Sequence, residues 1–148
     1  MSAPPAASLA DLYLADETAW LEAHAALIAA GRCDEIDMPH LAEYLADMAN
    51  RDRKEVKSRL VVLLTHLLKW EYQPERRGGS WAGTIEEQRQ ELVDDLTSGT
   101  LRNHAAAVFA AAYAMARKRA AAETQLPVGT FPEACEWDLV GVLAEPVE

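Results

Sequence analysis

The stretch that decides the fold is EVKSRLVVLLTHLLKWEY, residues 55–72. At about 100° per residue, its large apolar side chains form two adjacent stripes that together cover most of the circumference of a helix. Such a helix is stable only when neighbours surround it, so we expect it at the centre of a helical bundle. The two stripes are Val56, Leu60, Leu63, Leu67 and Trp70, and Val61, Leu64, Leu68 and Tyr72.

Two helices are predicted before this stretch. The first is capped by Asp16 and stops at Gly31, and the second is capped by Asp37 and carries Pro39 in its first turn. The polar run from residue 50 to residue 54 is either a break or the exposed middle of one long helix. A short break or kink is favoured, because Asn and Asp side chains offer the backbone competing hydrogen bonds.

Two more helices are predicted after it. Pro74 ends the central helix. The next helix covers residues 80–97, with either Ser80 as its N-cap or a capping box at Thr84. After a turn, an alanine-rich helix covers residues 101–123, and beyond residue 127 only one short helical turn is expected, after Trp137.

These elements predict an all-α protein, and no stretch shows the sustained alternation of a β-strand. With 148 residues, we expect a single compact domain of about five helices over residues 16–148, arranged as an up-and-down bundle. Residues 1–15 are expected to be a loose tail. The chain shows neither a signal peptide nor a membrane span, so we expect a cytoplasmic protein.

The net charge of the chain, −10, disfavours nucleic acid and anionic membranes as partners. Residues 51–77 depart from this average, because they hold eight basic and four acidic side chains. Two interpretations remain open. The basic residues either form a solvated helix face with acidic neighbours, or they mark a local anion site.

Catalytic and metal motifs are not found. The four histidines, His24, His40, His66 and His104, have no metal-ligand spacing, and Cys33 and Cys135 are expected to be reduced thiols. No nucleophile motif is present. We therefore predict neither a metal nor another cofactor.

The most concentrated group of polar and aromatic residues lies at the corner between the central helix and the next one. Arg76 and Arg77 precede two glycines and a helix N-terminus, where free amides favour an anion. In the alternative interpretation, the glycines only make a tight turn and the polar side chains lock the corner. The candidate residues are His66, Lys69, Trp70, Gln73, Arg76, Arg77, Ser80, Trp81, Gln88 and Arg89.

The same stretch resembles a known family. The sequence HLLKWEYQPERR at residues 66–77, followed by Ser80-Trp81, Thr84-Ile85 and Gln88-Arg89, is similar to the central signature of the bacterial domain of unknown function family 29. Similarity extends over roughly residues 16 to 143. The resemblance implies a compact helical domain of bacterial origin without an established activity, substrate or cofactor.

The sequence is compatible with two classes of function. The first is an interaction or regulatory protein without catalytic activity, with a second copy of the chain or another protein as its partner. The second is an enzyme or binder that acts on a small phosphorylated or carboxylated ligand. In that case His66 would be the acid or base, the basic side chains of the corner would hold the anion, and Trp70 and Trp81 would form the walls.

Overall fold

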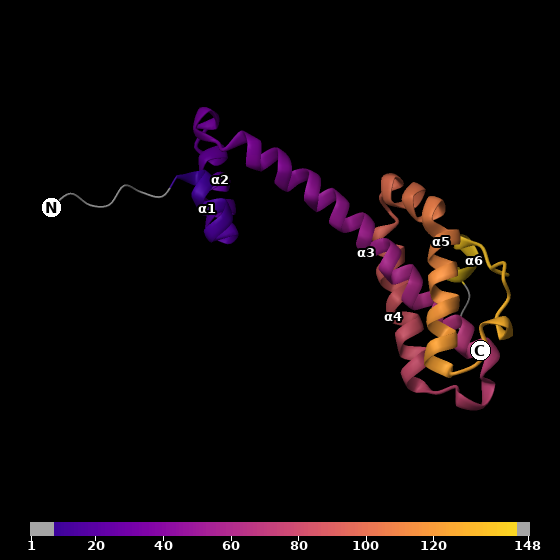
Figure 1. Ribbon diagram of the computed structural model, residues 1–148. Helices are drawn as coiled ribbons and strands as arrows, with labels where there is room; N and C mark the ends of the chain where they lie inside the picture. Colours follow the sequence, from indigo (N-terminus) through magenta and orange to yellow (C-terminus); the bar gives the residue numbers. More distant parts are fainter. Residues whose placement is uncertain (1–7, 145–148) are drawn as a thin grey trace. The chain divides into compact units, whose positions relative to one another are not determined.

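The computed structural model describes residues 8–144, and all of the regular structure in this range is helical, which confirms the all-α prediction. The chain forms two compact units, Met1–Asn50 and Arg51–Glu148. No helix among the described residues is long and apolar enough to cross a membrane. The α-helices are α1 (Leu9–Ala15), α2 (Glu17–Ala29), α3 (Met38–Tyr72), α4 (Gly79–Asp95), α5 (Gly99–Thr124) and α6 (Leu139–Ala144), with short 3-10 helices η1 (Cys33–Glu35), η2 (Pro74–Arg76) and η3 (Val128–Thr130) (Figure 1).

Several predicted helix ends are confirmed. The Asp16 carboxylate accepts a hydrogen bond from the Ala19 amide at 3.1 Å at the start of α2. Gly31 follows the end of that helix with a φ of 72°, a left-handed conformation that glycine adopts without strain. Pro74 stands two residues after the last residue of α3. These helix ends could be predicted because each depends only on residues that are close in the sequence.

The predicted start of α4 is wrong. The helix begins at Gly79, and Gly78 is the N-cap residue in an extended conformation, so neither Ser80 nor Thr84 caps it. The Thr84 hydroxyl instead donates to the Ser80 carbonyl at 3.0 Å. This is the usual bond of a threonine inside a helix, where Thr84 cannot be an N-cap.

The favoured break near Asn50 does not occur. The alternative, one long helix with an exposed middle, is confirmed, because α3 continues from Met38 to Tyr72 without interruption. Asn50, Arg51 and Asp52 are exposed there. Further along, Arg59 pairs with Glu55 at 2.6 Å, a spacing of four residues that supports a helix. A polar run without strong breakers therefore remains helical.

The segment expected to be a loose tail contains a helix. Within residues 1–15, residues 9–15 form α1, whose N-cap Ser8 accepts a hydrogen bond from the Asp11 amide at 3.1 Å. The remaining residues of that segment, 1–7, lie outside the described part of the chain.

The first unit has an aromatic centre around Trp20, which is completely buried. The Tyr13 ring meets the Trp20 ring edge to face at 4.8 Å and stacks on the His40 ring at 4.4 Å. His24 Nε2 accepts a hydrogen bond from the Asp37 amide at 3.0 Å, so the neutral ring carries its proton on Nδ1 and donates it to the Trp20 carbonyl at 2.8 Å. These contacts join α1, α2 and the start of α3.

Asp37 connects this centre to the N-terminus of α3. Its Oδ2 atom accepts hydrogen bonds from His40 Nδ1 at 2.6 Å and from Trp20 Nε1 at 3.3 Å. Burial alone would raise the pKa of Asp37, but the hydrogen bonds from the His40 ring, the Trp20 indole and the His40 amide outweigh it and lower the pKa. The ionised carboxylate is therefore the form that the folded state favours.

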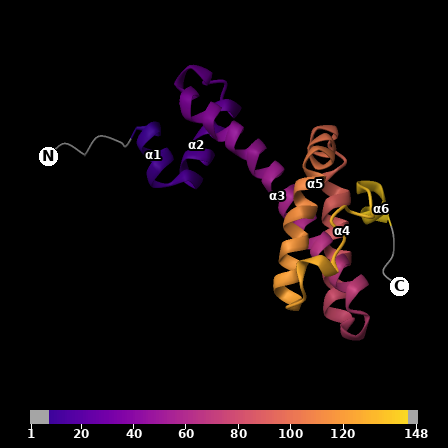
Figure 2. The same cartoon turned by 45° about the vertical axis from the view of Figure 1, so that its right-hand side comes forward.

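The second unit is a bundle around the second half of α3, where Leu60, Leu63 and Leu64 are completely buried. Figure 2 shows α4 and α5 beside this half of α3, with the C-terminal segment running back along α5. Phe131 and Val142 from that segment are also buried in the core. The prediction that residues 55–72 form the central helix of a bundle is confirmed.

Asp37→Asn tests whether the carboxylate charge stabilises the first unit. A carboxyl group with a lowered pKa in the folded state adds stability above its unfolded-state pKa, and that contribution is lost as the pH falls through the folded-state pKa. We expect the variant to melt at a lower temperature than the parent protein at neutral pH, and the difference to disappear in acid. Thermal unfolding followed by circular dichroism from about pH 7 to about pH 2 measures this. The exposed Asp34, changed to Asn, is the control, and an equal difference at every pH would contradict the expectation.

Candidate functional site

The ten candidate residues of the predicted site all belong to α3, η2, α4 and the links between them, but their side chains do not meet at one point. His66 is half buried, and its Nδ1 atom lies 2.9 Å from the Val62 carbonyl of its own helix. Gln73 is buried, whereas Arg76 and Ser80 are exposed. The histidine proposed as acid or base is therefore hydrogen-bonded within α3.

The two tryptophans of the corner each lie against a cation. Lys69 Nζ lies 4.9 Å from the centre of the Trp81 ring and 3.1 Å from Glu123 Oε2 on α5. The Arg77 guanidinium lies 5.1 Å from the centre of the Trp70 ring, and its Nε atom donates to the Trp70 carbonyl at 2.7 Å. Both contacts tie neighbouring elements together, as cation–π pairs and hydrogen bonds do in a structural corner.

The last two candidates contact different groups. Gln88 Oε1 accepts a hydrogen bond from Arg59 at 3.3 Å, and Arg59 also pairs with Glu55. Arg89 is buried, and its Nε atom donates to the Val142 carbonyl of α6 at 2.7 Å. The candidate residues thus take part in several separate contacts, most of which join helices.

Side chains from the bundle also hold the irregular C-terminal segment. The Tyr113 hydroxyl donates to the Pro132 carbonyl, and Arg117 Nε donates to the Phe131 carbonyl at 3.0 Å. Burial, together with weaker effects of neighbouring groups, raises the pKa of Tyr113 to about 12. The phenol therefore keeps its proton, which it needs in order to donate.

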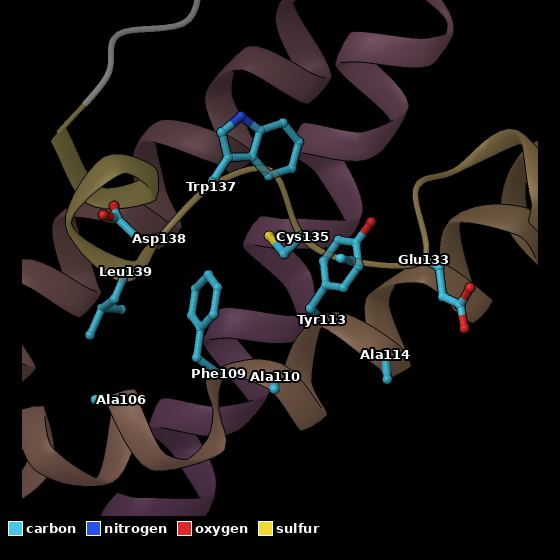
Figure 3. A pocket seen from close by; sticks show the side chains of 11 residues that line it. Ala106, Phe109, Ala110, Tyr113, Ala114, Glu133, Cys135, Trp137, Asp138 and Leu139 are labelled. Atoms are coloured by element: carbon cyan, nitrogen blue, oxygen red, sulfur yellow. The ribbon is translucent and has the colours of Figure 1, made fainter.

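Between α5 and this segment lies a groove of about 500 Å³, which we call the α5 groove. Figure 3 shows the rings of Phe109, Tyr113 and Trp137 around it, with Glu133 at one end and Asp138 at the other. Its volume lies in the range typical of binding sites, and most of its surface is apolar. The groove is lined by Ala106, Phe109, Ala110, Tyr113, Ala114, Glu133, Ala134, Cys135, Trp137, Asp138 and Leu139.

Burial is the main influence on the pKa of the Cys135 thiol of the α5 groove. Burial raises the pKa of the Cys135 thiol, and the nearby Glu136 carboxylate raises it further, although a hydrogen bond with the Trp137 backbone opposes them. A thiol with a raised pKa is a poor nucleophile at neutral pH. Glu133 and Asp138 are exposed, and one oxygen of Asp138 accepts a hydrogen bond from the Gly141 amide at 2.7 Å.

Two other hollows of similar volume are less suited to a ligand. One, in the first unit, is lined by Arg32 and Glu35, which pair with each other. The other lies beside Lys118, and its second cation, Arg117, is bonded to the C-terminal segment. Neither includes an aromatic ring, so the α5 groove is the stronger candidate site.

Sequence reasoning did not find the α5 groove. It predicted an alanine-rich helix over residues 101–123 and, beyond residue 127, only one short helical turn. The available signal is the pattern EACEWD at residues 133–138, in which three carboxylates alternate with a thiol and an indole. Nothing in that pattern indicates which helix it faces.

The described residues form an all-helical fold with an apolar groove, and no metal-binding cluster occurs among them. Comparison with known families is more specific, because residues 12–146 match the family described as domain of unknown function DUF29. The chain belongs to this family, as its central signature predicted. No curated protein and no solved structure matches the chain.

Arg89→Met tests the structural role that the geometry gives to this arginine. The change removes the donor to the Val142 carbonyl and leaves that oxygen without its partner, so we expect a loss of about 1.5–3 kcal/mol in the free energy of unfolding. Urea unfolding measures the loss, and amide hydrogen exchange should increase most in α6. The exposed neighbour Gln90, changed to Met, should lose less than about 0.5 kcal/mol. Equal losses in both variants would contradict this role.

Proposed function

We propose that this chain is a cytoplasmic interaction protein without catalytic activity, and that it binds a peptide segment of another protein in the α5 groove. The observation that carries the proposal is the groove itself, an apolar hollow of about 500 Å³ with three aromatic rings. Aromatic side chains are enriched at the centres of protein interfaces, where they bury a large area for little loss of conformational freedom.

The chemistry of the groove supports binding more than catalysis. The pKa of Tyr113 is raised to about 12, and its hydroxyl is used by the Pro132 carbonyl. The pKa of the Cys135 thiol is raised as well. A general acid or base works best with a pKa near the working pH, and a nucleophile needs activation, so these groups fit neither role.

Binding of a small anion at the corner is the alternative, and fewer observations support it. Arg76 and Arg77 are both exposed there. Three cations of the proposed patch already have partners, however. Lys69 pairs with Glu123, and Arg77 and Arg89 donate to backbone carbonyls.

Peptide binding in the α5 groove can be tested by substitutions that fill the groove with large side chains. Ala106 and Ala110 line the groove, whereas Ala42 and Ala46 are exposed on α3 outside it and have the same spacing. Short peptides selected on the purified chain from a random display library should bind at least about tenfold more weakly to Ala106→Trp/Ala110→Trp, because the indoles occupy the space. The matched variant Ala42→Trp/Ala46→Trp should retain binding.

Two results of this selection would contradict the proposal. The first is that no peptide is enriched above background on the parent protein. The second is that the enriched peptides bind both double variants equally, because their site would then lie elsewhere. Circular dichroism of each variant verifies that it is folded.

Self-association is a second part of the proposal, and the outward face of α5 supports it. Met115 is 48% exposed, and the exposed Ala107 and Ala111 nearby would let a second copy approach closely. Light scattering should therefore give the mass of a dimer for the parent protein and of a monomer for Ala111→Glu. Ala25→Glu, at an exposed position on α2, is the control and should remain dimeric. A monomer at every concentration of the parent protein would contradict self-association.

A further inference from the structure

The residues that line the α5 groove indicate the chemistry of the partner that it would bind. Its apolar floor comes from the alanines and Phe109 of α5, and its far wall comes from the segment of residues 133–139. That segment contains three acidic side chains and no basic one. The imbalance continues beyond the wall, because residues 120–148 contain six acidic side chains and no basic side chain.

The acidic side chains stand at the edges of the apolar surface. Glu133 and Asp138 line opposite ends of the groove (Figure 3). Glu136 lies close enough to raise the pKa values of both Cys135 and Tyr113. All three carboxylates are exposed, and no ion pair of theirs occurs among the described residues. Lys118 lies near Glu133 in a neighbouring hollow, whereas no basic side chain in the described part of the chain lines the α5 groove itself.

We propose that the α5 groove binds a segment of a protein partner in which large apolar residues are flanked by lysine or arginine. The apolar side chains enter between Phe109 and Trp137, and the flanking cations lie beside the exposed carboxylates. This proposal rests on the proposed function and specifies its partner. A negatively charged segment would instead meet like charges at both ends of the groove, which is an effective way to reject a wrong partner.

The test uses blocked synthetic peptides with one apolar core and different flanks. The probe is acetyl-Lys-Lys-Leu-Phe-Leu-Leu-Lys-Lys-amide, and its counterparts carry Gln or Glu in place of every Lys. Isothermal titration on the full chain should show the Lys peptide binding at least about tenfold more tightly than the Glu peptide. The preference should decrease between about 20 mM and about 300 mM salt, because exposed charge pairs are screened.

Two variants test whether the preference for the Lys peptide arises at the α5 groove. Glu133→Gln/Glu136→Gln/Asp138→Asn removes the three charges, and asparagine at position 138 retains an oxygen for the Gly141 amide. This variant should bind the Lys and Gln peptides equally. The matched control removes the same charge from exposed positions outside the groove, as Glu75→Gln/Glu87→Gln/Asp94→Asn, and should keep the preference of the parent protein.

Each other outcome overturns the inference. Equal binding of the Lys and Glu peptides by the parent protein would do so while leaving peptide binding in the groove intact. Binding of the Lys peptide that is unchanged in Ala106→Trp/Ala110→Trp would place it elsewhere. If none of the three peptides binds, the cationic specificity is wrong, and the display selection then decides whether the groove binds peptides at all. If light scattering gives a monomer for Ala106→Trp/Ala110→Trp and a dimer for the parent protein, the occupant of the groove is a second copy.

Discussion

The second half of α3 must be covered on nearly all sides, and the rest of the second unit depends on this constraint. Leu60, Leu63 and Leu64 are completely buried, and each buried leucine adds about 1.5–3 kcal/mol relative to exposure. The helices α4 and α5 cover part of the surface. The remainder is covered by the C-terminal segment, which places Phe131 and Val142 in the core.

Covering a core with irregular chain creates a second requirement. An irregular segment does not pair its own carbonyls, and an unpaired polar group near a core is costly. The bundle therefore supplies donors. Tyr113 and Arg117 donate to carbonyls of the irregular stretch, and Arg89 donates to the Val142 carbonyl in the last turn of α6. The α5 groove follows from this arrangement, because the segment is held at those carbonyls while the small side chains of Ala106, Ala110 and Ala114 leave space along α5.

The helices could be predicted from the sequence because their signals are local. Asp16 caps α2, Pro74 follows α3, and the apolar stripes of residues 55–72 indicated a central helix. The prediction of a break near Asn50 was wrong, because an intrinsic preference for turns is weak and the exposed polar run remains helical. The α5 groove could not be predicted in this way. Its two walls are far apart in the sequence, and periodicity identifies a buried face without indicating what packs on it.

The cations of the corner make contacts that the pattern of side chains did not indicate. Arginine and lysine suggested anion binding, but backbone carbonyls and aromatic faces also attract these cations and leave no mark in the pattern of side chains. Arg77 contacts Trp70 in both of these ways, and Arg89 donates to Val142. The residues that carry the family resemblance therefore largely explain how α3, α4 and the C-terminal segment are joined. A binding role is better sought where apolar surface stays open and nearby carboxylates remain exposed, which is along α5.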